Sequence, residues 1–89
     1  MNLEQFYDKL KKTDIWGEGF WQGLVDLIMA SNAYPYYKIM YIELALKGAI
    51  YNLQQRLNMS KSKSAMTTVM EEKKQKLQAL CRELMKVTP

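Results

Sequence analysis

The side chains that could carry out chemistry are few in this chain of 89 residues, and their spacing assembles no known active site. There is no histidine, which removes the commonest general base and the commonest zinc ligand. Cys81 is the one cysteine, so neither an internal disulfide nor a zinc site of known ligand spacing can form. We therefore expect no catalytic residue, no metal and no cofactor.

The single thiol has an ordinary structural interpretation. Cys81 follows Leu80 and precedes Leu84 by three residues, at the margin of an apolar stripe. A reactive thiolate needs a histidine or a helix N-terminus beside it, and neither is near in sequence. The position predicts a small buried hydrophobic residue.

The carboxylates that could pair as general acid and base also have a simpler explanation. They are Asp26, Glu43, Glu71, Glu72 and Glu83. Glu43 stands four residues before Lys47 and Glu72 four before Lys76, which is the favourable order for ion pairs on a helix surface. Asp26 lies between Val25 and Leu27, and we expect it on the exposed face of its helix.

Charge and aromatic residues are distributed in opposite directions along the chain. Residues 1–53 carry five lysines and six acids, whereas residues 54–89 carry eight basic residues and three acids. All ten aromatic residues lie between Phe6 and Tyr51. A basic helix face can follow a phosphate backbone, so nucleic-acid binding is one hypothesis. Its candidate residues are Lys61, Lys63, Lys74, Arg82 and Lys86. The interrupting acids, and the absence of interleaved aromatics for base stacking, favour a solvated helix face instead.

Tyrosines are concentrated within eight residues of the aromatic half. Tyr34, Tyr36, Tyr37 and Tyr41 are more than one helical face can bury, so we expect some of them at the surface. Tyrosine is enriched at the energetic centres of protein interfaces. Methionines such as Met66 and Met70 add adaptable apolar surface in the second half. These six residues are the candidate partner-binding residues.

Apolar periodicity predicts four helices, at about 3–12, 18–31, 35–58 and 64–87. Helical spacing is clearest in the third, where Ile39, Ile42, Leu46, Ala49 and Leu53 repeat at intervals of three and four. Pro35 suits the first turn of that helix, and Gly48 is the one interruption, where a neighbouring helix could approach closely. No stretch alternates with the period of two expected for a strand.

Length and helix pattern together predict one all-α domain spanning 1–89. The last two helices should form a long antiparallel hairpin within a small bundle of three or four helices. The first two helices together are long enough to cover this hairpin, although a partner or a second copy could cover it instead. A compact globule of this length has a radius of gyration of roughly 12 Å.

The sequence therefore predicts a non-enzymatic protein–protein interaction module: a small regulator, adaptor or inhibitor that binds a protein partner or a second copy of itself. Nucleic-acid binding through the basic C-terminal half is the alternative. No apolar stretch approaches the roughly 20 residues that span a bilayer, and the acidic N-terminus does not fit a signal peptide. These features, with the lone cysteine, predict a cytoplasmic protein without a transmembrane segment.

Overall fold

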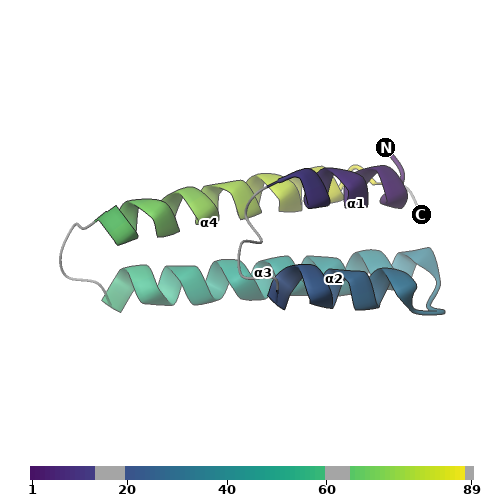
Figure 1. The fold of residues 1–89 in the computed structure, drawn as a ribbon, viewed down its shortest axis with the longest axis horizontal. Coiled ribbons are helices and arrows are strands. Elements are labelled where there is room, and N and C mark those ends of the chain that lie inside the picture. Colours follow the sequence, from purple (N-terminus) through teal and green to yellow (C-terminus); the bar gives the residue numbers. More distant parts are fainter. Residues whose placement is uncertain (14–19, 60–64, 88–89) are drawn as a thin grey trace.

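The computed structural model describes residues 1–13, 20–59 and 65–87, and this part of the chain is built from four helices. They are α1 (Leu3–Lys12), α2 (Phe20–Ala30), α3 (Pro35–Met59) and α4 (Ala65–Leu84). The all-α fold is confirmed. The long α3 and α4 lie antiparallel and pack closely along their length, as the predicted hairpin requires (Figure 1).

The two short helices cover only one half of this hairpin. α1 lies along α4 and α2 lies along α3, both at the end where the chain termini meet (Figure 1). The opposite half, where α3 ends and α4 begins, is a two-helix arm with no third helix of the described chain against it. The molecule measures 44 × 22 × 20 Å, and its radius of gyration is 13.8 Å. It is thus longer than the compact globule expected from the number of residues.

The hydrophobic core lies in the covered half. Its buried residues are Leu3, Phe6, Leu10, Val25, Ile42, Leu46, Ala49, Leu77, Leu80, Leu84 and Val87. In the arm, none of the residues 50–59 and 66–76 is fully buried. Two packed helices leave much of each helix surface in contact with water, because only one narrow stripe of each faces the other. The fold is therefore stabilised mainly at the end that α1 and α2 cover.

α1 begins with a capping box, which holds this short helix at its first turn. The Asn2 side chain accepts a hydrogen bond from the Gln5 amide at 2.8 Å, and Gln5 Oε1 accepts one from the Asn2 amide at 3.0 Å. Such a cap contributes about 1 kcal/mol. A ten-residue helix is marginal in water by itself, so α1 depends on this cap and on its buried face.

Most predicted helix boundaries agree with the observed ones to within one residue. Residues 18 and 19 lie outside the described chain. The clear difference is at the last helix, which was expected to reach 87 but ends at Leu84. There the Lys86 and Val87 amides donate to the carbonyls of Glu83 and Leu84 at 3.0 Å, three residues back instead of four. This tightened turn replaces the last helical turn and still brings Val87 into the core.

Candidate protein-binding surface

α3 has two apolar faces, and only one of them is buried. The inner face carries Ile42, Leu46 and Ala49, which are buried, and half-buried Ile39 and Leu53, as the periodicity of the sequence predicts. A second series with the same spacing of four and three residues runs along the opposite face. Its members, here called the outer stripe, are Tyr37, Tyr41, Leu44, Gly48, Tyr51 and Gln55. At 1.5 Å per residue, the outer stripe is about 27 Å long.

The large side chains of the outer stripe are exposed to solvent. The exposed fraction is 46% for both Tyr37 and Tyr41, 60% for Leu44 and 64% for Tyr51. Several large apolar groups in one row on a helix are unusual on the free surface of a monomer, where they mark an interaction site. Leu44 and Tyr51 were not singled out from the sequence. Their spacing relative to Tyr37 and Tyr41 is the signal that could have identified them.

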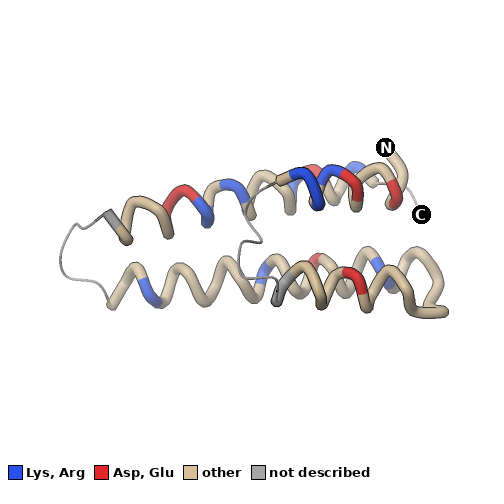
Figure 2. Tube along the Cα trace, viewed as in Figure 1, with Lys and Arg blue, Asp and Glu red and all other residues tan. Residues whose placement is uncertain are grey.

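No charged residue belongs to the outer stripe. The ionisable residues of α3 besides tyrosine are Lys38, Glu43, Lys47 and Arg56, and none of them occupies a position of the stripe. Figure 2 shows only a few charged positions along α3. Lys47 Nζ forms an ion pair with Glu43 at 2.7 Å, which confirms the surface pair expected from their spacing and raises the pKa of Lys47. Lys38 Nζ donates to the carbonyl of Met29 in α2 at 2.9 Å. These two lysines are therefore held by their own chain.

Gly48 is an open position in the middle of the outer stripe. A Cβ atom built there would meet nothing within 4 Å among the described residues, so none of the four helices α1–α4 uses the glycine for close approach. A glycine inside a helix costs about 1 kcal/mol relative to alanine. The free space above it faces outward, between Leu44 and Tyr51.

All four tyrosines named from the sequence are exposed. Tyr34 is 76% exposed and Tyr36 is 64% exposed, so the prediction that some of the group reach the surface is confirmed. The rings of Tyr36 and Tyr37 meet edge to face, with centroids 5.7 Å apart and planes at 76°. This arrangement orders two rings at the start of α3 while leaving both accessible. The side chains of Trp16, Phe20 and Trp21 lie outside the described residues.

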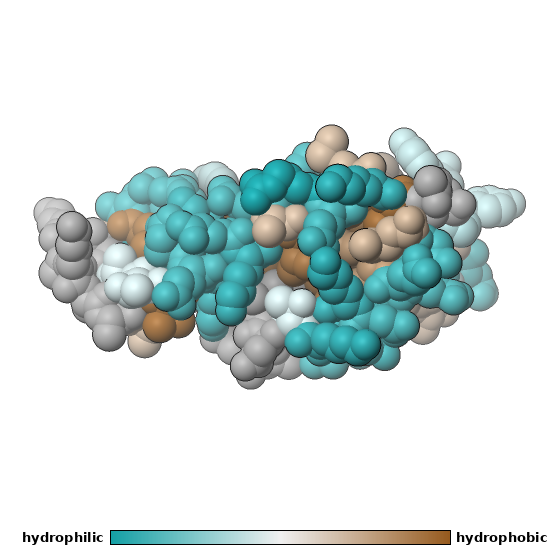
Figure 3. Space-filling view, turned by 90° about the horizontal axis from the view of Figure 1, so that it is seen from above, coloured by the Kyte–Doolittle hydropathy of each residue, from teal (hydrophilic) through white to brown (hydrophobic). Residues whose placement is uncertain are grey.

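The two candidate methionines lie far from the tyrosines. Met66 is 68% exposed and Met70 is half-buried, both near the start of α4. The tyrosines lie near the start of α3, at the opposite end of the hairpin (Figure 1). Seen from above, hydrophobic atoms appear on the arm among mainly hydrophilic ones (Figure 3). The structure therefore separates the six predicted residues into two surfaces.

The basic residues named for the alternative function do not form one continuous row. Lys61 and Lys63 lie outside the described residues. Lys74 has a side chain only 15% exposed, and its ammonium donates to Gln54 Oε1 at 2.7 Å and approaches Glu71 at 3.4 Å. Arg82 and Lys86 are exposed. Lys74 thus links α4 to α3, and little of its side chain is accessible to a ligand.

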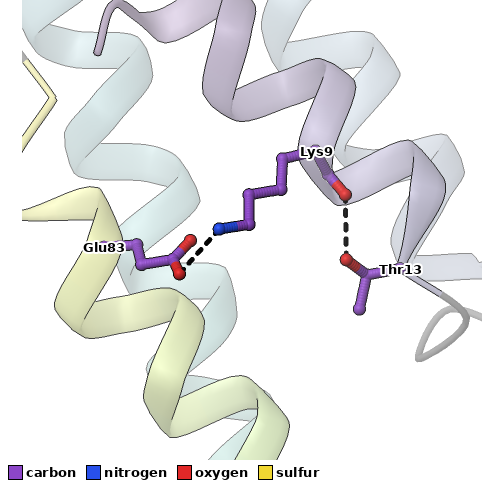
Figure 4. A network of polar contacts seen from close by, with 3 residues as sticks. All are labelled: Lys9, Thr13 and Glu83. Carbon is purple, nitrogen blue, oxygen red and sulfur yellow. Dashed lines mark hydrogen bonds and ion pairs between the residues drawn. The ribbon is translucent and has the colours of Figure 1, made fainter.

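A cross-helix ion pair fixes α1 on α4. Lys9 Nζ lies 2.7 Å from Glu83 Oε1, and the Thr13 hydroxyl donates to the Lys9 carbonyl at 2.8 Å (Figure 4). Glu83 Oε2 is buried without a hydrogen-bond partner. Lys9 is half exposed, which limits the gain from this pair to about 1 kcal/mol. The contact serves to position the helix and explains why Glu83 is engaged within the fold.

Cys81 is half-buried and packs against the core, so the expected buried position is met only in part. Burial, the largest cause, raises the pKa of its thiol, and the nearby Lys47 only partly offsets this effect. We therefore expect Cys81 to react with a disulfide reagent at pH 7–8 more slowly than the same thiol in the unfolded chain, because less thiolate is present. The measurement is the rate of thiol modification from pH 7 to 10, with and without denaturant. Equal rates in the two states at pH 8 would contradict the assignment.

The remaining candidate groups do not gather into a reactive cluster. Asp26 is exposed, as expected from its place on an apolar helix. Within residues 1–13, 20–59 and 65–87, no three histidine, cysteine or acidic residues lie close enough to hold a metal ion. No helix in those ranges has the length and hydropathy needed to span a membrane. The outer stripe is therefore one exposed apolar feature of the described chain that the fold itself does not use, and exposed Met59, Met66 and Val69 on the arm are another.

The architecture is that of a small all-α bundle carrying a long helical hairpin. Comparison of the chain with models of protein families, with characterised proteins and with solved structures finds no significant match. A proposal about the function therefore rests on the surface chemistry of the chain itself.

Proposed function

We propose that this chain is a non-enzymatic protein–protein interaction module. It binds a protein partner, as a small regulator, adaptor or inhibitor in the cytoplasm, through the outer stripe of α3 and the adjoining Tyr34 and Tyr36. The observation that supports this proposal most directly is the exposed row of tyrosine and leucine side chains, with no charged member, on a helix whose opposite face is the core.

The chemistry of the outer stripe suits protein recognition. Each tyrosine offers a large apolar ring with few rotatable bonds, so burying it on binding costs little side-chain entropy. Leu44 adds an aliphatic group at the centre of the row. Hot-spot residues lie at such centres, where a partner can exclude water from them completely.

Replacing Tyr36, Tyr37 or Tyr41 by alanine is expected to weaken partner binding without loss of helicity. All three side chains are exposed, so their removal leaves no cavity in the core. Truncation of a buried interface tyrosine costs about 2 kcal/mol, a loss of affinity of roughly 30-fold. The measurement is a binding titration with the captured partner beside circular dichroism of each variant. Met85→Ala is the matched control, since Met85 is 84% exposed and lies beyond the end of α4. A variant that melts would show that the tyrosine stabilises the fold and is no interface residue.

A pull-down of the tagged chain from its native lysate, with and without nuclease, separates this function from the alternative. A stoichiometric protein that survives nuclease and is lost with the tyrosine variants supports the interaction module. Recovery that disappears with nuclease supports nucleic-acid binding through Lys61, Lys63, Lys74, Arg82 and Lys86. That alternative also requires affinity to fall steeply with salt, because each neutralised phosphate releases counterions. It has less support, because Lys74 is held by Gln54 and Glu71.

A further inference from the structure

We propose that the outer stripe of α3 pairs with the outer stripe of a second copy of this chain, with the two helices antiparallel. This inference rests on the proposed function, since it identifies the partner of the same binding surface. It commits to self-association, and an unrelated helix on the stripe is an outcome that the tests below distinguish.

The spacing of the outer stripe is the same when read in either direction. Its intervals are four, three, four, three and four residues, centred at position 46. Any row with this alternation has that property, and it allows an antiparallel copy to be placed in register about a two-fold axis, with each contact of i with j repeated as j with i. An antiparallel copy places Tyr41 opposite Tyr51 of the second copy and Tyr37 opposite Gln55.

The residues that meet at the centre fit each other in size. The same register places Leu44 opposite Gly48 of the second copy, on both sides of the two-fold axis. Leu44 is 60% exposed, and the position above Gly48 is empty to at least 4 Å. A leucine facing a glycine across two helices is a knob facing a hole, which lets the two backbones approach closely. The outward-facing Gly48, which lowers the stability of the monomer, thus allows close packing of the two helices in the dimer.

The charge pattern also favours a second copy over a charged partner. The outer stripe contains no group that an acidic or basic partner could neutralise. Of the flanking ionisable residues, Lys47 comes nearest the two-fold axis, where it approaches Lys47 of the second copy. Each of these lysines is already paired with Glu43 of its own chain at 2.7 Å, which reduces their repulsion. Lys38 is likewise engaged with the Met29 carbonyl.

The exposed surface of the chain is large enough for such an interface. The accessible area is 6325 Å² for a mass of 10.5 kDa. A compact monomer of that mass exposes about 5,400 Å², so the chain has roughly 900 Å² in excess. A standard interface takes about 800 Å² from each partner. The chain therefore has enough exposed surface for one side of a dimer, although its elongated shape also contributes to this excess.

The first test measures mass by sedimentation equilibrium or light scattering over a wide range of protein concentration. The wild-type chain should double its mass from 10.5 kDa as concentration rises. Leu44→Glu should remain monomeric at every concentration, because the dimer would bury two unpaired carboxylates next to Gly48. Met85→Glu is the control for added charge at an exposed apolar residue, and it should dimerise like the wild type.

Gly48→Ala distinguishes dimer packing from an effect on the fold, because the two predict opposite signs. The new methyl group has open space in the monomer and favours helix, so the monomer should melt a few degrees higher. The same methyl fills the space intended for Leu44 of the second copy, so dimer affinity should fall about tenfold or more. A variant that is both more stable and less dimeric is the expected result.

Cross-linking tests the antiparallel register. In a Cys81→Ser background, a Tyr41→Cys chain mixed with a Tyr51→Cys chain should form a disulfide-linked dimer, and either chain alone should not. A parallel pair would cross-link each chain with itself and would overturn the register.

A wild-type mass that stays at 10.5 kDa, or a dimer that Leu44→Glu does not weaken, would overturn self-pairing through this stripe. The proposed interaction with another protein is tested separately, by whether the Leu44→Glu chain still captures that protein in the pull-down. Loss of the captured protein would support the interaction module, and its retention would contradict binding through the outer stripe.

Discussion

Phe6→Ala is expected to lower the free energy of unfolding by about 3–5 kcal/mol, the range found when a fully buried aromatic residue is removed from a core. Phe6 is 0% exposed and belongs to the central cluster, although it lies on the shortest helix. A domain of this length has a total stability of roughly 4–13 kcal/mol. The variant should therefore be largely or partly unfolded at ambient temperature.

The reason is that Phe6 and its neighbours Leu3 and Leu10 are the buried contacts of α1. An isolated ten-residue helix does not persist in water, so losing the central contact releases the whole element and uncovers part of α4. Urea unfolding followed by circular dichroism measures the effect. Asp8→Ala, at an exposed position of the same helix, is the control and should change stability by less than about 0.5 kcal/mol. A Phe6→Ala loss as small as the control's would mean that α1 is not docked as described.

Two leucines two residues apart on α3 should respond very differently to the same substitution. Leu46 is 0% exposed and Leu44 is 60% exposed. Leu46→Ala should cost about 2–5 kcal/mol, because it removes the three carbon atoms beyond Cβ from a packed core and leaves a cavity. Leu44→Ala should cost less than about 0.5 kcal/mol in the monomer, because solvent already contacts the side chain.

This pair of variants tests the orientation of α3 about its own axis. Both should be measured by urea unfolding at a protein concentration too low for self-association, so that only the fold contributes. Both variants replace leucine by alanine in the same helix, so the change in helix propensity is the same and the difference between them reports burial. If both leucines cost the same, α3 is rotated from the orientation described or both of its faces are buried. In the second case the outer stripe would be core, and the proposed interface would be lost.

Periodicity was informative wherever a helix has one apolar face. In α1 the spacing of Leu3, Phe6 and Leu10 predicted the buried side, and in α3 Ile42 and Leu46 were predicted correctly to face inward. Such spacing is local, because residues three and four apart share a side of any α-helix. The helix count, the hairpin and the inner face of α3 could therefore be predicted from the sequence.

The outer stripe could not be assigned in the same way. The sequence shows Tyr37, Tyr41, Leu44 and Tyr51 as large apolar residues on a helix that has a second apolar row, and periodicity alone does not say which of the two rows is covered. Exposure depends on where the other helices lie, and the Met66 and Tyr41 surfaces were grouped together although they lie at opposite ends of the hairpin. Likewise, a lysine spaced as a surface residue, Lys74, is held between two helices.

By itself the sequence determined the secondary structure, the lack of histidine and the contrast between an aromatic and a basic half. These follow from residue types and from interactions within a few positions of one another. The tertiary structure alone decided that α1 and α2 cover one half of the hairpin, that all four tyrosines are exposed and that Gly48 opens outward. The physical reason is that burial is a property of packing between distant segments. An apolar side chain is equally suited to a core or an interface until its neighbours are known.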